Sequence, residues 1–320
     1  MRAARLSSPK QFELLDVDVP TLEEGQVLIR LQRLSICGSD LRIYDRLLPE
    51  EEYPMAPGRP GHECAGVVED SRSDEYQAGQ RVIVLPSASA GLVEYVAEAP
   101  GRIIPLPDEG DLTTLLMCQP MGTVMYCCKR IGSVLGKRVV VLGQGAIGLS
   151  FTDMMVRQGA SQVIAVDLLD YRLEHAKKLG ATHTINAGRD NVVTAVEEVT
   201  HGELADVVVE AVGRPESANM IWPLVRLQGV VALFGLPHDQ DTFPFDYDAM
   251  MSKLPTILAT VGARSADPTQ HIKECVDLVA QGRLDMSHLV THRMTFDDVQ
   301  KAYDMYSDKT DGIIKVVMDL

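Results

Sequence analysis

Apolar residues in the first hundred positions of this 320-residue chain fall into short runs that are rich in valine, isoleucine and leucine. Glycine and proline separate these runs, which is typical of β-strands joined by turns. The runs at 27–34, 64–68, 81–85 and 92–97 are therefore predicted to be strands. Together they indicate a compact, partly barrel-like β domain that carries its polar motifs in loops.

From about residue 113 the pattern changes. A long apolar segment over 113–130 predicts a helix, and strand and helix patterns then alternate. The predicted strands are 138–142, 162–166, 182–185, 206–210 and 229–234, and the predicted helices are 146–158, 170–179, 191–200 and 216–226. This alternation is typical of α/β proteins with a doubly wound parallel sheet.

Three more elements are predicted toward the C-terminus. The run at 257–261 indicates a strand, and 267–281 indicates a helix with Pro268 in its first turn, a position that tolerates proline. The run at 312–318 is predicted to be a terminal strand that could return to the first domain. The expected fold class is α/β, with a β-rich domain and a doubly wound domain.

Composition narrows the class of protein. Hydrophobic residues make up 46% of the chain and charged residues 23%, as in soluble globular proteins. No apolar run is long enough to span a bilayer, and the first residues lack a signal-peptide pattern, so a cytoplasmic protein is expected. The net charge of −15 argues against nucleic acid and anionic membranes as partners. The six cysteines form no Cys-x-x-Cys pair, and most are expected to be reduced and buried.

A glycine-rich segment between the predicted strand 138–142 and the following helix has the Gly-x-Gly-x-x-Gly pattern. In this context the first glycine permits a tight turn, the second lets the backbone approach a pyrophosphate, and the third allows close packing of helix and strand. The amides at the helix N-terminus can bind the anion. The residues predicted to bind a dinucleotide here are Gly143, Gly145, Ala146, Ile147 and Gly148.

An acidic residue follows at the expected distance. Asp167 ends the second strand of the alternating region, where a carboxylate can accept hydrogen bonds from an adenosine ribose and repel a 2′-phosphate. The sequence therefore favours NAD over NADP as the cofactor. Arg172, on the next predicted helix, could also approach the ribose, although a solvated surface position is equally compatible with the pattern.

Two short motifs upstream of the glycine-rich segment carry candidate zinc ligands. Cys37-Gly-Ser39-Asp40 and Pro-Gly-His62-Glu63 each place a good zinc donor close to a carboxylate that could orient or supplement it. A catalytic zinc ion usually has three protein ligands and one open position for substrate. The two motifs supply two ligands at once and leave the third to be identified.

The ordered set of motifs resembles the medium-chain dehydrogenase/reductase family, in its zinc-dependent alcohol and polyol dehydrogenase branch. Cys-Gly-Ser-Asp, Pro-Gly-His-Glu, the glycine-rich segment and the ending Gly-Ile-Ile-Lys-Val-Val occur in the family's order over nearly the whole chain. The resemblance implies a GroES-like catalytic domain over 1–120, completed by 265–320, and an inserted Rossmann domain over 121–264, with the active site in the cleft. It also implies a homodimer or homotetramer.

The resemblance further implies roles for single residues. Cys37 and His62 match the first two catalytic zinc ligands, and Ser39 matches the hydroxyl that binds the substrate alcohol and relays its proton. Asp40 and Glu63 match carboxylates around the ligands, and in some members the glutamate approaches the metal itself. Zinc lowers the pKa of the alcohol, which then donates hydride to the nicotinamide.

This chain departs from the family pattern at two positions near the zinc site. Gln119, before Pro120, stands where the polyol branch has a glutamate or aspartate that completes the zinc site. The amide of Gln119 could bind the metal, hold a water or contact the substrate, while the adjacent Cys118 is a less favoured ligand because it points elsewhere on a helix. Arg42 stands where the family often has a relay histidine; it cannot act as a base, and could bind a cofactor phosphate or an anionic substrate.

The structural zinc of many family members is not expected here. The four closely spaced cysteines that bind it are absent, and 86–91 runs straight into the next strand. The predicted function is a zinc-dependent, NAD-linked oxidoreductase that interconverts a secondary alcohol and a ketone, with a sugar, cyclitol or other polyol as the suggested substrate. The alternative is a zinc-independent NAD(P)-binding reductase, or a non-redox enzyme, on the same fold.

Overall fold

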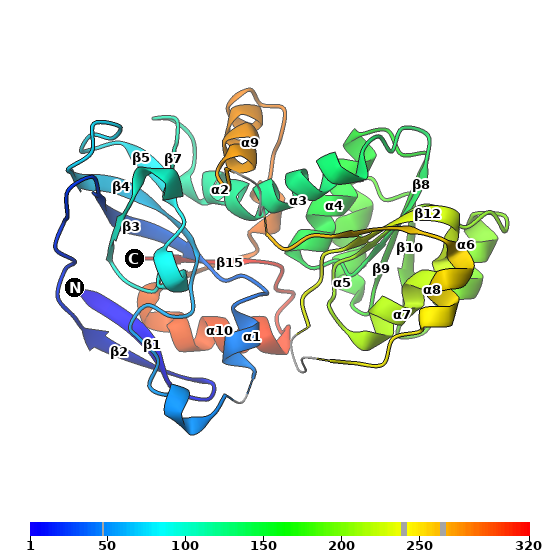
Figure 1. Ribbon diagram of the computed structural model, residues 1–320, viewed down its shortest axis with the longest axis horizontal. Helices are drawn as coiled ribbons and strands as arrows, with labels where there is room; N and C mark the ends of the chain where they lie inside the picture. Colours follow the sequence, from blue (N-terminus) through cyan, green and yellow to red (C-terminus); the bar gives the residue numbers. More distant parts are fainter. Residues whose placement is uncertain (47, 238–241, 263–266) are drawn as a thin grey trace. The chain divides into compact units, whose positions relative to one another are not determined.

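A computed structural model describes residues 1–46, 48–237, 242–262 and 267–320 of the chain (Figure 1). The chain forms two compact units, one of Met1–Gly122 with Ser265–Leu320 and the other of Thr123–Arg264. The expected domain boundary at 264–265 lies outside the described residues. No helix in the described part of the chain is both long and apolar enough to cross a membrane.

The first unit is built on a seven-stranded sheet with the strand order β14-β15-β3-β4-β5-β7, in which β6 also pairs with β3. The strands are β3 (Val27–Ser35), β4 (Glu63–Ser71), β5 (Arg81–Val84), β6 (Tyr95–Glu98), β7 (Ile103–Pro105), β14 (His292–Thr295) and β15 (Val316–Asp319). The C-terminal strand β15 pairs antiparallel with β3. The predicted return of the terminal strand to the first domain is therefore confirmed.

A hairpin that the sequence patterns did not predict opens the chain. It consists of β1 (Arg2–Ser8) and β2 (Gln11–Asp16). Only β1 buries apolar residues, namely Ala3, Ala4 and Leu6, because β2 has a mostly exposed pattern. The weak apolar signal of both strands explains why they were missed.

Short helices complete the first unit. They are α1 (Leu41–Tyr44), α2 (Leu112–Leu116), α9 (Gln270–Ala280) and α10 (Val299–Asp308), with 3-10 turns η1 (Glu50–Glu52), η2 (Ser87–Ser89), η3 (Pro100–Arg102), η4 (Ser287–Leu289) and η5 (Phe296–Asp298). The predicted place of Pro268 inside a helix was wrong. Helix α9 starts two residues later, because the Asp267 carboxylate accepts hydrogen bonds from the amide and hydroxyl of Thr269 and forms a turn before the helix.

Three aromatic rings in the first unit join segments that are distant in the sequence. Phe12, Tyr44 and Tyr303 come from β2, α1 and α10, and their ring centroids lie 4.7 to 5.7 Å apart. The buried hydroxyl of Tyr303 donates to the carbonyl of Pro60 at 2.7 Å. This cluster therefore supports both loops that carry the candidate zinc ligands.

The second unit contains a six-stranded sheet whose neighbouring strands are all parallel, in the order β10-β9-β8-β11-β12-β13 (Figure 1). The strands are β8 (Arg138–Leu142), β9 (Gln162–Asp167), β10 (His183–Asn186), β11 (Ala205–Glu210), β12 (Val225–Leu233) and β13 (Thr256–Ala259). The helices are α3 (Cys118–Ile131), which begins at the end of the first unit, α4 (Ala146–Arg157), α5 (Asp170–Lys178), α6 (Val192–Val199), α7 (Pro215–Leu224) and α8 (Tyr247–Lys253). The predicted doubly wound parallel sheet is confirmed.

Proline explains two differences from the predicted helices. The single helix predicted over 113–130 is interrupted at Met117, which places Pro120 in the first turn of α3, where its missing N–H is tolerated. The helix predicted over 216–226 ends at Leu224, one residue after Pro223, and Val225 already belongs to β12.

Candidate active site

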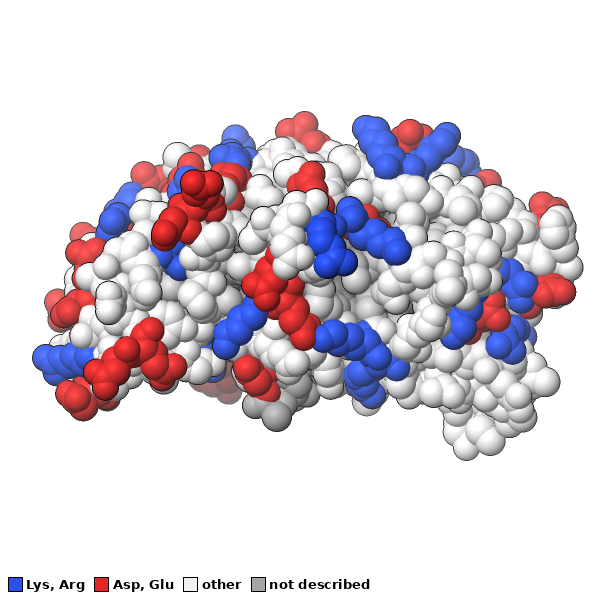
Figure 2. Space-filling model, turned by 90° about the horizontal axis from the view of Figure 1, so that it is seen from above, with Lys and Arg blue, Asp and Glu red and all other residues white. Residues whose placement is uncertain are grey.

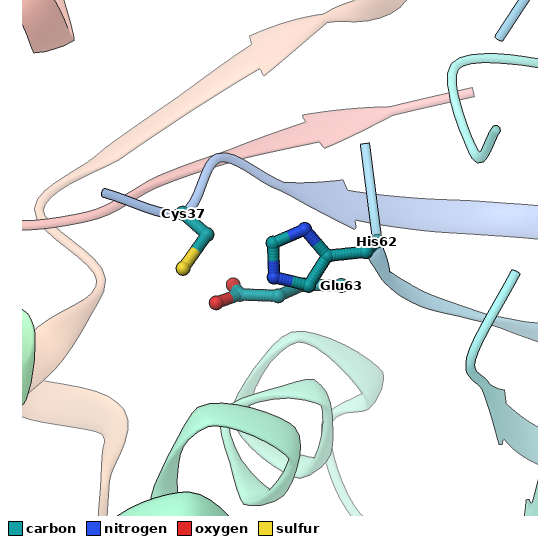
Figure 3. A group of neighbouring side chains, drawn as sticks. All are labelled: Cys37, His62 and Glu63. Atoms are coloured by element: carbon teal, nitrogen blue, oxygen red, sulfur yellow. The ribbon is translucent and has the colours of Figure 1, made fainter. Parts of the chain in front are cut away.

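Three candidate metal ligands meet in the first unit (Figure 3). The donor atoms of Cys37, His62 and Glu63 all lie within 4.8 Å of one another, and these three residues are called the metal cluster below. Cys37 follows β3, while Glu63 is the first residue of β4, and Ser35 pairs with Glu63 across the two antiparallel strands. The end of one strand therefore lies beside the start of the next, which brings the two sequence motifs together.

Asp40 connects the two loops of the metal cluster. One carboxylate oxygen lies 2.8 Å from His62 Nδ1, and the other accepts the amide N–H of Cys37 at 2.9 Å. The side chain is buried, so both contacts are shielded from water. Because Nδ1 of His62 is engaged, Nε2 is the nitrogen left to bind a metal.

The charge of His62 depends on its surroundings. Burial lowers its pKa, but the nearby Asp40 and Cys37 raise it more, so the pKa lies well above the usual value. An imidazole must be neutral to bind a metal ion. Below this raised pKa, metal binding has to displace a proton from His62.

Glu63 is fully buried and has a buried cation as its partner. Lys315 Nζ lies 2.6 Å from one Glu63 carboxylate oxygen and 2.9 Å from the other, and it also donates to the carbonyl of Ile36 at 2.9 Å. The hydroxyl of Ser35 donates to the same carboxylate. Burial alone would lower the pKa of Lys315, but the charge of Glu63 raises it overall.

Neither Lys315 nor Ser35 was identified as a site residue from the sequence. Lys315 is 252 positions from Glu63, and its only signal was the terminal Gly-Ile-Ile-Lys motif. A lysine inside an apolar strand is rarely buried without a charged partner. That unusual placement was the available clue.

Ser39 and Arg42 lie next to the metal cluster in the chain. The hydroxyl of Ser39 donates to Cys37 Sγ at 3.2 Å, so it stands beside one proposed metal ligand. Arg42 belongs to α1 and is partly exposed.

The candidates for a third ligand are both buried in the first turn of α3. Gln119 is 8% exposed and Cys118 is fully buried. The preceding helix α2 contacts β3 and β4, the strands that carry the metal cluster. Burial raises the pKa of the Cys118 thiol to about 12, which makes it a poor source of thiolate.

The segment between β5 and β6 lies beside the loop that carries His62. It is a short connection that contains η2. The carbonyl of Ser89 accepts the amide N–H of Gly61, and the carbonyl of Gly61 accepts the amide N–H of Gly91, both at 2.9 Å. This connection therefore supports the loop that precedes His62.

The glycine-rich turn in the second unit has the geometry that its motif requires. Gly143 has a φ of +86°, and a Cβ at Gly148 would lie 1.8 Å from the carbonyl oxygen of Gly143. At Gly145 the nearest atom to such a Cβ would be 3.8 Å away. Helix α4 starts at Ala146 without a side-chain cap, so the amides of Ala146 and Ile147 lie at an N-terminus that can bind an anion.

Asp167 lies at the carboxyl end of β9, beside this turn. Its carboxylate accepts the amide N–H of Gln144 at 2.6 Å and that of Leu169 at 3.0 Å. Arg172 Nη1 lies 3.7 Å from Asp167. Arg172 Nε is buried and has no hydrogen-bond partner among the described residues. The structure thus brings the glycine turn, the carboxylate and the arginine together at the crevice expected for a dinucleotide.

Glu210 is a further residue at this crevice that the sequence patterns did not single out. Its buried carboxylate accepts hydrogen bonds from the amides of Val212 and Gly213 at 2.8 Å and from the hydroxyl of Ser217 at 2.7 Å. It fixes the turn after β11, next to the turn after β8. Its position at the end of a buried strand was the signal that could have identified it.

Comparisons with known proteins agree with this geometry. Residues 23–108 match the family model of the alcohol dehydrogenase GroES-like domain, and residues 146–281 match that of zinc-binding dehydrogenases. An alcohol dehydrogenase of Cupriavidus necator is 28% identical over 99% of this chain and 98% of its own length. A sorbitol dehydrogenase of Bacillus subtilis is 25% identical over 99% and 97%.

A solved structure agrees as well. The alcohol dehydrogenase TADH from Thermus sp. ATN1 has a TM-score of 0.85 at 25% identity, covering 100% of this chain and 99% of that chain. This structure matches the chain over both units, and so do the two sequence relatives. The chain therefore belongs to the medium-chain dehydrogenase/reductase family, in its zinc-type alcohol and polyol dehydrogenase branch.

Proposed function

We propose that this protein is a zinc-dependent, NAD-linked oxidoreductase that interconverts a secondary alcohol and a ketone, with a sugar, cyclitol or other polyol as its substrate. The observation that supports this most is the metal cluster, in which a thiol, an imidazole and a carboxylate face one another. In this proposal the first unit holds the metal, and the second unit binds the dinucleotide.

The donor set fits a zinc ion. Sulfur and nitrogen ligands of a tetrahedral zinc ion are separated by roughly 3.5 Å, and the 4.8 Å limit of the metal cluster allows this with small side-chain movements. Cys37 and His62 are the proposed ligands, with Glu63 or Gln119 as the third. Asp40 orients the imidazole of His62, and Lys315 balances the charge of Glu63.

The chain's own residues then handle the proton of the substrate. When bound, zinc lowers the pKa of an alcohol, and NAD accepts the hydride that the alcohol carbon releases. Ser39 lies beside Cys37, so its hydroxyl can bind the substrate hydroxyl and accept its proton while it releases its own. Arg42 cannot accept a proton at neutral pH, so the proton that Ser39 releases would pass through a ribose hydroxyl of the cofactor to water.

We propose NAD rather than NADP as the cofactor. Asp167 is buried beside the glycine turn at the end of β9, where a carboxylate would repel a 2′-phosphate. Arg172 lies close to Asp167 and weakens this repulsion. Fluorescence titration with NADH and NADPH separates the two cofactors, and at least tenfold tighter binding of NADH is expected.

We further propose one catalytic zinc per chain, no structural zinc, and a homodimer or homotetramer. The segment 245–261 carries six exposed apolar side chains and includes the edge strand β13, which is a ready template for pairing with a second copy. Light scattering tests the oligomer, and Ile257→Glu is expected to shift it toward monomer. The cytoplasmic location stays a prediction.

The proposed function is tested by metal analysis together with a nicotinamide absorbance assay over a panel of polyols. About one zinc per chain and NAD reduction with at least one polyol are expected. Turnover by zinc-free protein would instead favour the zinc-independent alternative. A protein that binds neither zinc nor NADH would contradict both.

A further inference from the structure

Arg42 lies in α1, three residues after Ser39. The amide N–H of Arg42 donates to the carbonyl of Ser39 at 3.3 Å, so the two residues belong to one helical turn. Residues three positions apart in such a turn project from the same side. Ser39 points to Cys37 Sγ, whereas Leu41 and Tyr44 are buried in the core.

Arg42 has no carboxylate partner among the described residues, although two are close in sequence. Asp45 is suitably placed three residues on, but it contacts Lys10 Nζ at 2.9 Å and accepts the hydroxyl of Ser307. Asp40 is engaged with the Cys37 loop and His62. Acidic and basic side chains are intermixed on the face shown in Figure 2, and several arginines of the first unit pair with a carboxylate. The guanidinium of Arg42 therefore has hydrogen-bond donors available for a ligand.

The charges around the metal cluster leave one positive charge in excess. With a zinc ion bound, three groups are anionic: the Cys37 thiolate and the Asp40 and Glu63 carboxylates. They face the dication, Lys315 and Arg42, which together carry four positive charges. Gln119 adds no negative charge to this set.

We propose that the substrate is a polyol or hydroxy compound that carries an anionic group, a carboxylate or a phosphate, and that Arg42 binds this group and determines specificity. A guanidinium suits both groups because its planar fork can form two parallel hydrogen bonds. The net charge of −15 does not oppose this binding, since screening limits its reach to about 8 Å at physiological ionic strength. The inference rests on the proposed dehydrogenase function.

The test compares substrates that share one carbon skeleton: an alditol, the corresponding aldonate and the alditol phosphate, each from four to six carbons. Initial rates of NAD reduction give kcat/KM for each, and calorimetry with the NADH complex gives the Kd of the aldonate and phosphate. If the aldonate is preferred, the anionic group of the substrate is a carboxylate. If the alditol phosphate is preferred, it is a phosphate. The variants are Arg42→Gln, Arg42→Lys and, as a matched control, Arg30→Gln, an exposed arginine on β3 that pairs with Glu69.

The wild type is expected to prefer an anionic member of the series over the alditol. Arg42→Gln should lower this preference by about 10- to 100-fold and weaken the anion's Kd similarly, because a charge-assisted hydrogen bond is lost. Arg42→Lys should recover part of the preference for the anionic substrate, and Arg30→Gln should keep the full preference. Equal or better turnover of the neutral alditol would overturn this inference and leave the dehydrogenase function standing. A uniform rise of the KM for NAD in Arg42→Gln would also overturn it, whereas turnover of no substrate would contradict the proposed function itself.

Discussion

In the first unit, the groups placed to hold a metal and the charged groups that support them are side chains from three distant parts of the chain, around residues 37–40, at 62–63 and at 315. In the second unit, the groups placed to bind a dinucleotide are mostly backbone amides of one continuous turn, 143–148, with the carboxylate of Asp167 beside them. The metal cluster is rich in buried charge, whereas the glycine turn depends on the absence of side chains.

Because of this difference, substitutions at the two sites should impair different properties of the protein. Each buried charge in the metal cluster is balanced by a partner, so a change of charge should disturb metal binding and stability. The glycine turn has little free volume, so an added methyl group should disturb cofactor binding. The two losses should be separable, because the partners of each site lie within one unit.

The largest effect is expected from Lys315→Met. This substitution leaves Glu63 as an unpaired buried carboxylate, and removing one member of a buried pair costs about 3–5 kcal/mol. Chemical unfolding of the zinc-free protein measures the loss. The pKa of Lys315 is raised in the folded state, so its contribution is present below about pH 10 and lost as pH rises further. The matched double variant Glu63→Gln/Lys315→Met should regain much of the stability; no recovery would contradict the pairing.

The next effect should appear at the glycine turn. Gly148→Ala places a Cβ 1.8 Å from the backbone oxygen of Gly143, so the turn has to move. We expect NADH binding to weaken at least tenfold and stability to fall by about 1–3 kcal/mol, while zinc content stays the same. Gly145→Ala is the control, because its Cβ meets no atom closer than 3.8 Å. It should weaken NADH binding through contact with the pyrophosphate and leave stability nearly unchanged.

Zinc affinity should depend on pH more than NADH affinity does. The pKa of His62 is raised, so below that pKa a proton competes with the metal, and affinity should rise about tenfold per pH unit for the imidazole alone. Titration with a chromophoric chelator at several pH values measures this. In Asp40→Asn the main charge that raises this pKa is removed, so the pH dependence should move to lower pH. An unchanged profile would contradict the assigned role of Asp40.

The smallest effect is expected far from both sites. Asp206 accepts the amide N–H of Arg138 at 2.8 Å and pairs with Arg226 at 2.6 Å. Burial by itself would raise the pKa of Asp206, but these contacts outweigh burial and lower the pKa overall. Asp206→Asn should cost about 1 kcal/mol at neutral pH. Because the folded pKa is lowered, the difference from wild type should shrink as pH falls below about 4, with zinc and NADH binding intact throughout.

Much of the fold was predictable because its signals are local. The strands β8, β9 and β11 have continuous apolar runs at their centres, and the glycine turn lies between two of the predicted elements. Elements with weak apolar patterns, such as the β1–β2 hairpin, were missed. Proline shifted the ends of α3 and α7, and a turn at Asp267 shifted the start of α9.

The site residues divide in the same way. Cys37, His62 and Asp167 occur in recognisable motifs, so the sequence could suggest them. Lys315 acts through a contact across 252 positions, which no local pattern encodes. Glu210 acts through the turn that follows it, and its place at the end of a buried strand was a signal too weak to single it out. Tertiary pairing of buried charges was therefore the part that the sequence could not supply.

The most direct test of the central claim compares Cys37→Ala with Cys118→Ala, measuring zinc content, NADH affinity and turnover on the same preparations. We expect Cys37→Ala to lose zinc and turnover but to bind NADH as the wild type does, and Cys118→Ala to keep all three. Zinc or turnover that survives in Cys37→Ala, or that is lost only in Cys118→Ala, would contradict the proposed zinc site.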